Sequence, residues 1–139
     1  MIAILGFYYI FEPHITMSLR KLSRYSLALY LILISILSLL PSNDLPNVML
    51  FPNADKLIHC TMYAGLTFLL LTGWPHFFIS NRKLLIVIVI AFWGIVMELL
   101  QGTAAIGRSY DLKDELANIL GFFPGWFTAY VAGKIWKLK

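Results

Sequence analysis

Four long apolar stretches divide the chain. They cover residues 22–40, 57–74, 84–100 and 116–136. A helix that crosses a lipid bilayer needs about 17–25 apolar residues, because each residue advances the helix by about 1.5 Å. Lipid offers no hydrogen-bond partners to the backbone, so such stretches must be helical. The pattern predicts an all-α integral membrane protein, folded as a four-helix bundle.

The composition supports this prediction. The chain has 139 residues, of which 60% are hydrophobic and 13% are charged, whereas a soluble domain has about 25% charged residues. A net charge of +4 suggests nucleic acid in a soluble protein. Here, however, the basic residues lie at the ends of apolar stretches, where they set membrane orientation. We therefore expect no nucleic-acid partner. The single cysteine, Cys60, cannot form an internal disulfide.

The basic residues also predict the orientation. Most of them lie before the first stretch, between the second and third, and after the fourth: Arg20, Lys21, Arg24, Arg82, Lys83, Lys134, Lys137 and Lys139. With four spans these segments share one side, and segments rich in Lys and Arg stay in the cytoplasm. We expect a multi-pass protein of the bacterial cytoplasmic membrane with both termini in the cytoplasm. The opposite side carries Asp44, Asp55, Asp111, Asp114 and Glu115.

The first residues form a pattern of their own. Residues 1–11 are apolar but too short to span, and Glu12-Pro13 is expected to break that segment. Met17 is followed by a basic stretch and then by the first long apolar stretch. We hypothesise that translation begins at Met17, with residues 1–21 as an N-terminal extension and 22–136 as the transmembrane domain. The alternative is an interfacial N-terminal segment. An intact mass that includes the first sixteen residues would contradict a start at Met17.

Polar side chains concentrate at the outer ends of the predicted helices. Asp55, His59 and Tyr63 are four residues apart, so they share one helical face. Further along come Glu98, Gln101, a small-residue loop at 102–107, Arg108, Asp111, Asp114 and Asn118. If the last helix begins near Leu112, the final three of these also share a face. In a four-helix bundle, the three segments can lie together around one pocket.

Glu98 is the sharpest single candidate because apolar residues surround it in the sequence. A charge at the bilayer centre costs at least about 2.5–3.5 kcal/mol, so we expect Glu98 to face the bundle. Its candidate partners are Arg108, Lys56 and His59, and a buried acid with such partners suits proton transfer. Structural roles compete with this interpretation. Asp55, Asp111 and Asp114 lie where helix caps would lie, Tyr63 suits an interface, and an Arg108–aspartate pair is commonly structural.

The ordered set of polar residues resembles the VanZ-like family of small bacterial membrane proteins. The set comprises Asp55-Lys56-x-x-His59-x-x-x-Tyr63, Glu98-x-x-Gln101 and Arg108-x-x-Asp111-x-x-Asp114-x-x-x-Asn118-x-x-Gly121, preceded by a first helix ending in Leu-Pro. The match covers roughly residues 22–136. It implies that these residues form the family's shared site, although Cys60 stands where the family often has an aromatic residue. The namesake is associated with low-level resistance to the glycopeptide teicoplanin, and the resemblance by itself does not imply that this protein confers resistance.

The leading functional hypothesis is a pocket facing out of the cytoplasm that recognises or modifies an anionic, lipid-linked molecule of the cell envelope. Lys56 and Arg108 would hold phosphate or carboxylate groups, while Tyr63, Gln101, Asp111, Asp114 and Asn118 would complete the binding set. Aromatic residues such as Phe122, Phe123 and Trp126 would border the lipid tail. The expected partners are membrane lipid and a lipid-linked cell-wall precursor or glycopeptide.

A second hypothesis is catalysis within the membrane. Asp55 would orient His59 as a general base, and Glu98 would act as acid or base. A metal-assisted hydrolase or transferase through His59, Glu98, Asp111 and Asp114 is a variant of this hypothesis. It has only one histidine, because His14 and His76 map to the inner side, and this weakens a zinc site. We therefore assign no metal and no cofactor from the sequence.

Two further interpretations are weaker. Transport is disfavoured, because the first and last predicted helices have no acidic residue at mid-depth. A structural or partner-binding membrane protein, in which the polar cluster only joins helix ends, stays open. It predicts that substitutions in the cluster destabilise the protein instead of leaving it folded and inactive.

Overall fold

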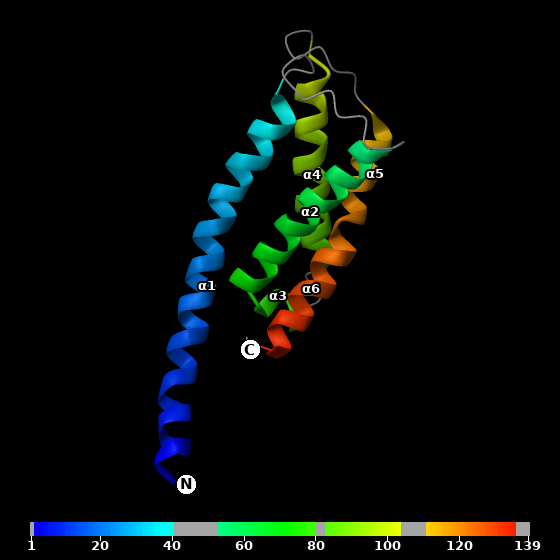
Figure 1. Ribbon diagram of the computed structural model, residues 1–139. Helices are drawn as coiled ribbons and strands as arrows, with labels where there is room; N and C mark the ends of the chain where they lie inside the picture. The colour runs from blue at the N-terminus through cyan, green and yellow to red at the C-terminus, as the bar shows by residue number, and fades with distance from the viewer. Residues whose placement is uncertain (1, 41–52, 80–82, 104–110, 136–139) are drawn as a thin grey trace.

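The computed structural model describes residues 2–40, 53–79, 83–103 and 111–135, and all regular structure in these residues is helical (Figure 1). The helices are α1 (Ile2–Leu39), α2 (Ala54–Gly73), α3 (His76–Ile79), α4 (Lys83–Gln101), α5 (Leu112–Leu120) and α6 (Phe122–Ile135). The prediction of an all-α protein is confirmed for this part of the chain.

Two of the helices are long and apolar enough to cross a membrane. They are the Ser18–Leu39 part of α1 and Leu84–Gln101 of α4. Only 11% of the first stretch and 33% of the second are buried inside the protein, so most of their apolar surface has no protein cover. Of the four predicted spans, these two have the length and hydropathy of a membrane helix.

The other two predicted spans differ for identifiable reasons. The first turns of α2 contain Asp55, Lys56 and His59, which lower its hydropathy. The last predicted span is divided into α5 and α6 at Gly121, whose backbone angles are still helical (φ −57°, ψ −22°). The two short helices therefore follow one another along nearly one line (Figure 1).

The path of α1 corrects one sequence prediction. The helix is continuous from Ile2 to Leu39, so Glu12-Pro13 does not break it. A proline removes one backbone hydrogen bond and crowds the preceding turn, which kinks or ends a helix, and here the turns on both sides of it remain helical. With 38 residues, α1 is roughly 57 Å long. Its N-terminal part extends past the ends of the other helices (Figure 1).

Two contacts show that α1 and α2 are antiparallel, and a third fixes the direction of α4 relative to α1. Arg24 donates from Nε to the Gly73 carbonyl over 2.9 Å near the end of α2. Further along α1, the Tyr30 hydroxyl donates to the Met62 carbonyl over 3.0 Å. At the end of α1, Gln101 Nε2 donates to the Ser38 carbonyl over 2.8 Å. The last contact joins the C-terminal ends of α1 and α4, so these two helices run in the same direction.

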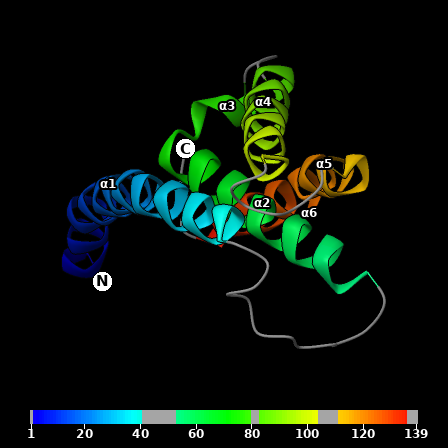
Figure 2. The ribbon, with the colours of Figure 1, turned by 90° about the horizontal axis from the view of Figure 1, so that it is seen from above.

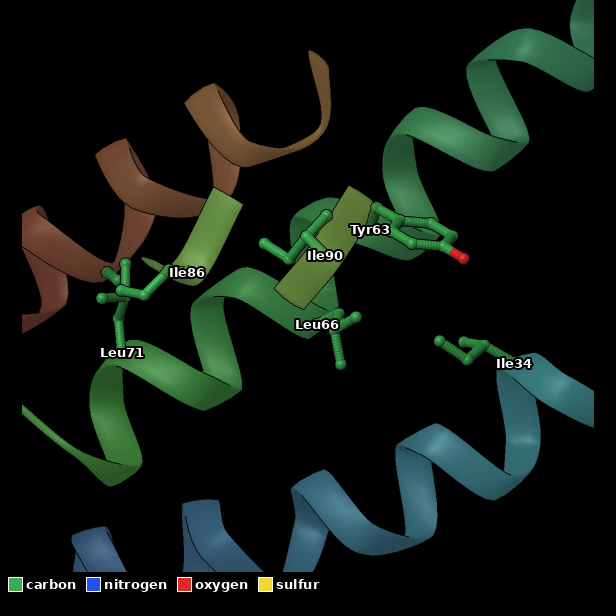
Figure 3. Packing of buried hydrophobic residues seen from close by; sticks show 7 residues of the cluster. Ile34, Tyr63, Leu66, Leu71, Ile86 and Ile90 are labelled. Carbon is green, nitrogen blue, oxygen red and sulfur yellow. The ribbon is translucent and has the colours of Figure 1, made fainter. Parts of the chain in front are cut away.

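Helix α2 occupies the centre of the arrangement and packs against α1, α5 and α6 (Figure 2). The apolar core lies along it and comprises Ile34, Tyr63, Leu66, Leu71, Ile86, Ile90 and Ala129 (Figure 3). These residues come from α1, α2, α4 and α6. The core thus ties the two candidate membrane helices to α6 and to α2, which carries Lys56 and His59.

Two glycines let α5 and α6 approach α2 closely. A Cβ at Gly121 would lie 2.5 Å from the Cys60 carbonyl oxygen, and one at Gly125 would overlap the Ala64 carbonyl oxygen. Small residues four apart allow such backbone contact between membrane helices. This close packing sets the position of α5 against α2, and with it the distance between the polar side chains of the two helices.

Charges of opposite sign lie at opposite ends of the helices. Arg24 lies over the Trp74 ring at 5.1 Å from its centroid, at the end where α2 finishes, and Lys134 lies in the last turn of α6. The N-terminal ends of α2 and α5 carry Asp55 and Asp114 instead. Arg24 and Lys134, two of the basic residues that predicted the orientation, therefore lie at the end opposite Asp55 and Asp114, where Lys56 and Lys113 also lie.

Candidate functional site

Lys56 is enclosed by three aspartates where α2 and α5 begin. Its Nζ atom lies 2.6 Å from Asp55 Oδ2, 2.7 Å from Asp111 Oδ2 and 2.7 Å from Asp114 Oδ1. Of the three candidate partners named for Glu98, Lys56 bonds to these aspartates instead, and its charge is already more than balanced. This lysine therefore joins α2 to α5 and is not left free to hold an anion.

His59 lies one turn deeper and contacts residues from α4 and α5. Its Nδ1 atom is 3.0 Å from Asn118 Oδ1 and 3.9 Å from Glu98 Oε1, and its Nε2 atom is 4.0 Å from Asp114 Oδ2. His59 and Asn118 are both buried, at 7% and 1% exposure. The three polar segments predicted to meet do meet, at this imidazole.

The Asn118 amide determines the orientation of the histidine ring. Asn118 Nδ2 donates to Glu115 Oε2 over 3.3 Å, so its oxygen faces His59. An amide oxygen can only accept a hydrogen bond, and His59 Nδ1 must therefore carry the proton. In the neutral imidazole, Nε2 then has the free lone pair and faces Asp114.

Glu98 is buried at 1% exposure, as expected for an acid within an apolar stretch. Its Oε2 accepts a long hydrogen bond from the backbone N–H of Asp111, over 3.4 Å. Its Oε1 has no hydrogen-bond partner among the described residues. Burying a carboxylate without full hydrogen bonding is costly, and Glu115 Oε1 is likewise buried without a hydrogen-bond partner among the described residues.

Glu115 is a second buried acid, and the sequence interpretation did not include it in the site. It is 4% exposed, and its carboxylate lies against Asn118 and against the backbone of Gly94 on α4. A Cβ at Gly94 would overlap Glu115 Oε2 and lie 3.0 Å from Asn118 Nδ2. The helical spacing of Asp111, Glu115 and Asn118 was the available signal, because residues four and seven apart share a face.

Three other predicted site residues have separate positions. Tyr63 is 1% exposed, belongs to the core, and its hydroxyl has no hydrogen-bond partner among the described residues. Gln101 is buried but bonds to Ser38 on α1, away from His59. Arg108 and most of the 102–107 loop lie outside the described residues. The geometry therefore brings His59, Glu98, Asp114 and Asn118 together and gives Gln101 a different partner.

The helix caps were predicted correctly at one helix and not at the other. Asp111 caps α5, which begins at Leu112 as expected, and its side chain accepts from the Lys113 N–H over 2.8 Å. Helix α2 is preceded by Asn53 in the left-handed conformation (φ 63°), without a side-chain cap. Asp55 lies inside the first turn and bonds to Lys56. Asparagine tolerates positive φ better than most residues.

Charge pairing shifts the pKa values of the charged groups where α2 and α5 begin. The hydrogen bond from Lys56 lowers the pKa of Asp55 below its ordinary value. The same lysine and the Lys113 backbone N–H lower the pKa of Asp111. Burial works against the charge of Lys56, but hydrogen bonds to three carboxylates outweigh it and raise its pKa. These groups stay ionised at neutral pH and hold the ends of α2 and α5 together.

The arrangement can support proton transfer and the binding of polar groups. A buried imidazole with a fixed tautomer lies about 4 Å from two carboxylates, one of them incompletely hydrogen-bonded. General acid–base catalysis uses this combination of an oriented base and an acid in a desolvated position. Asp55 does not contact His59, so the predicted role of Asp55 in orienting the histidine is taken by Asn118.

Comparisons of the chain with protein-family models, with curated proteins and with solved structures found no match. The resemblance to VanZ-like proteins therefore stays a prediction from the spacing of polar residues.

Proposed function

We propose that this chain is a four-span protein of the bacterial cytoplasmic membrane that recognises or modifies the anionic head group of an envelope lipid or lipid-linked molecule. The observation that carries this proposal is the position of the buried Glu98 carboxylate. It lies near the end of an apolar helix, beside His59 and the Asp111 backbone. If α4 spans a bilayer, as we propose, this end of the helix would lie at the depth at which lipid head groups meet the acyl chains.

The exposed apolar surface supports the membrane part of the proposal. Large side chains such as Leu29, Leu84, Phe92 and Phe127 are 59–70% exposed on α1, α4 and α6. In water, apolar surface of this extent on three helices would favour aggregation. In a bilayer it would contact lipid. The fourth proposed span consists of α5 and α6, which continue each other through Gly121.

An open apolar groove supports the lipid part of the proposal. It has a volume of about 500 Å³ between α1 and α4 and is lined by Leu31, Ser35, Leu39 and Trp93, among others. The Gln101–Ser38 hydrogen bond joins the same two helices at the polar end. A lipid whose head group lies near Glu98 would find a surface for an acyl chain along this groove.

The described part of the site is acidic, and this limits the ligands that it can bind without further positive charge. Asp55, Asp111 and Asp114 outnumber Lys56, and two further carboxylates are buried nearby. An anionic head group would need an additional positive charge. Arg108 is the side chain of this chain that we propose for that role.

The test separates a working site from a structural one. Membrane abundance and sensitivity to envelope-targeting antibiotics would be measured for Glu98→Gln and Arg108→Ala in the native bacterium. Normal abundance with altered sensitivity supports the proposal. Loss of the protein from the membrane supports the competing function, in which the cluster only holds helix ends together.

A second measurement addresses the ligand directly. Purified protein would be mixed with phosphatidylglycerol or with phosphatidylcholine and analysed by native mass spectrometry. We expect preferential retention of phosphatidylglycerol, and we expect Arg108→Ala to remove the preference. Equal retention of both lipids by the unsubstituted protein would count against recognition of an anionic head group.

A further inference from the structure

One donor atom each from His59, Glu98 and Asp114 lies within 4.8 Å of the other two. The residues belong to α2, α4 and α5, so the group exists only in the folded bundle. Imidazole nitrogen and carboxylate oxygen are the donors that divalent ions such as Zn²⁺ and Mn²⁺ accept. His59 and Glu98 are buried, and the Asp114 side chain is 14% exposed.

The separations are too long for hydrogen bonds and suit a bridging ion. His59 Nε2 lies 4.0 Å from Asp114 Oδ2, His59 Nδ1 lies 3.9 Å from Glu98 Oε1, and one donor atom of each residue lies within 4.8 Å of the other two. Ligands bound to one ion at about 2.0–2.2 Å are separated by at most roughly 4.4 Å. Small side-chain rotations would therefore bring all three donors onto one ion.

Glu98 provides an independent indication of a missing ligand. Its side chain is 1% exposed, and its Oε1, the atom nearest His59, has no hydrogen-bond partner among the described residues. Protonation of this oxygen would not give it a hydrogen-bond partner. The nearest nitrogen, His59 Nδ1, already faces the Asn118 oxygen as a donor and offers no lone pair.

Two further features of the residues around this group favour the binding of a cation. Asn118 accepts from His59 Nδ1, which is the outer hydrogen bond that metal-binding histidines usually make, and it leaves Nε2 free to bind. Carboxylates outnumber cations around the group, since Lys56 is shared among three aspartates and Glu115 is also buried nearby. A divalent ion would reduce this excess of negative charge.

We propose that His59, Glu98 and Asp114 bind a divalent metal ion, with Asn118 positioning the imidazole. The ion would place positive charge in a site whose described residues are acidic. Water would complete the coordination. The proposal does not depend on head-group recognition, because metal binding is measured without lipid ligands.

The experiment uses the full chain, purified in detergent and stripped with a chelator. Mn²⁺ is added, and the free ion is followed by electron paramagnetic resonance; Zn²⁺ and Mg²⁺ are then tested by competition. We expect one Mn²⁺ per chain. Glu98→Gln and Asp114→Asn should each weaken binding by at least about tenfold, since even outer-shell changes cost 10–100-fold.

Glu115→Gln is the matched control. It removes a carboxylate of similar burial, but the new amide oxygen can still accept from Asn118. Its Mn²⁺ affinity should fall much less than that of Glu98→Gln or Asp114→Asn, because Glu115 contributes charge but no donor atom to the group. Circular dichroism and gel filtration would verify folding. If Glu98→Gln does not fold, Asp114→Asn and His59→Gln supply the test at less deeply buried positions.

Two outcomes would overturn the proposal. One is an unsubstituted protein that binds neither Mn²⁺ nor Zn²⁺ up to roughly 1 mM, the limit of weak specific binding. The other is binding that Glu98→Gln, Asp114→Asn and His59→Gln leave unchanged, which would place the ion elsewhere. Either result would leave the lipid measurements unaffected, so the two proposals fail separately.

Discussion

Asn118 Oδ1 lies 3.0 Å from His59 Nδ1, and both residues are buried between α2 and α5. This contact joins two residues 59 positions apart in the sequence. It also belongs to a series of contacts that runs from Glu115 through the Asn118 amide and the imidazole to Asp114. The orientation of His59, on which both proposals depend, is therefore set by α5.

Replacing Asn118 tests this chain of contacts. Asn118→Leu should lower the free energy of unfolding by about 1–3 kcal/mol, because it leaves the buried His59 Nδ1 and Glu115 Oε2 without their partner. Thermal unfolding in detergent, followed by circular dichroism, measures the change. Thr61→Val is the control, since this exposed hydroxyl only bonds to the Leu57 carbonyl of its own helix. Equal stability of the two variants would contradict the assigned role of Asn118.

The contact of Gly125 with α2 should make this glycine intolerant of a side chain. Gly125→Ala would push a methyl group into the Ala64 carbonyl and Thr67, separating α6 from α2. We expect a loss of about 1–3 kcal/mol, as for overpacked cores. Gly133→Ala on the same helix meets nothing within 4 Å and should be neutral or slightly stabilising. A Gly125→Ala variant as stable as Gly133→Ala would show that the helices are not in close contact here.

Lys56 should be more important for stability than its position at a helix end suggests. Lys56→Met would leave three aspartates close together without a cation. A charged hydrogen bond is worth about 1.5–3 kcal/mol, and partial exposure places the expected loss near the lower value. Lys113→Met, an exposed lysine on α5, should change stability by less than about 0.5 kcal/mol. The prediction fails if both variants unfold at the same temperature.

The pairing of Asp55 with Lys56 predicts a specific dependence on pH. Because its pKa is lowered on folding, Asp55 contributes stability above its ordinary pKa of 3.8, and this contribution is lost as the pH falls through the lower folded value. Asp55→Asn should therefore be less stable at pH 7, by at most about 1 kcal/mol for so exposed a pair. The difference should decrease as the pH falls below 3.8 and vanish below the folded pKa. A difference that persists in acid would exclude this ion pair as its cause.

The proposed topology places Thr103 on the outer side of the membrane and Lys134 on the cytoplasmic side. In a Cys60→Ser background, Thr103→Cys should react with a membrane-impermeant maleimide in intact spheroplasts. Lys134→Cys should react only after the membrane is permeabilised. Both positions are exposed. Labelling of both positions in intact spheroplasts would contradict the assigned orientation, and labelling of neither would contradict an outward-facing polar end.

Several elements were predictable because local sequence alone determines them. The apolar stretches predicted α2 and α4 to within a few residues and the C-terminal end of α1 to within one residue, and the Asp111 cap marked the beginning of α5. The continuity of α1 through Pro13 was not predicted. A proline weakens a helix locally, whereas the outcome depends on whether the turns on both sides stay helical.

The candidate site was predicted in part. Periodicity placed His59 and Tyr63 on one face and Asp111, Asp114 and Asn118 on another, and burial of Glu98 followed from its apolar neighbours. The partners were not predictable. Lys56 bonds to aspartates and not to Glu98, and Gln101 bonds to Ser38. Glu115 was overlooked because its partners, Asn118 and Gly94, include a residue from another helix.

The sequence by itself determined that the chain is helical and apolar, which side chains share a helical face, and at which end of the helices the acidic and basic residues lie. These properties depend on the intrinsic period of a helix and on transfer of side chains out of water. Only the tertiary structure decided that Asn118 orients His59, that Glu98 and Asp114 lie about 4 Å from the imidazole, and that Glu115 is buried. Those distances depend on how closely α5 and α6 approach α2. Glycine contacts between distant segments set that approach, and no local pattern contains this information.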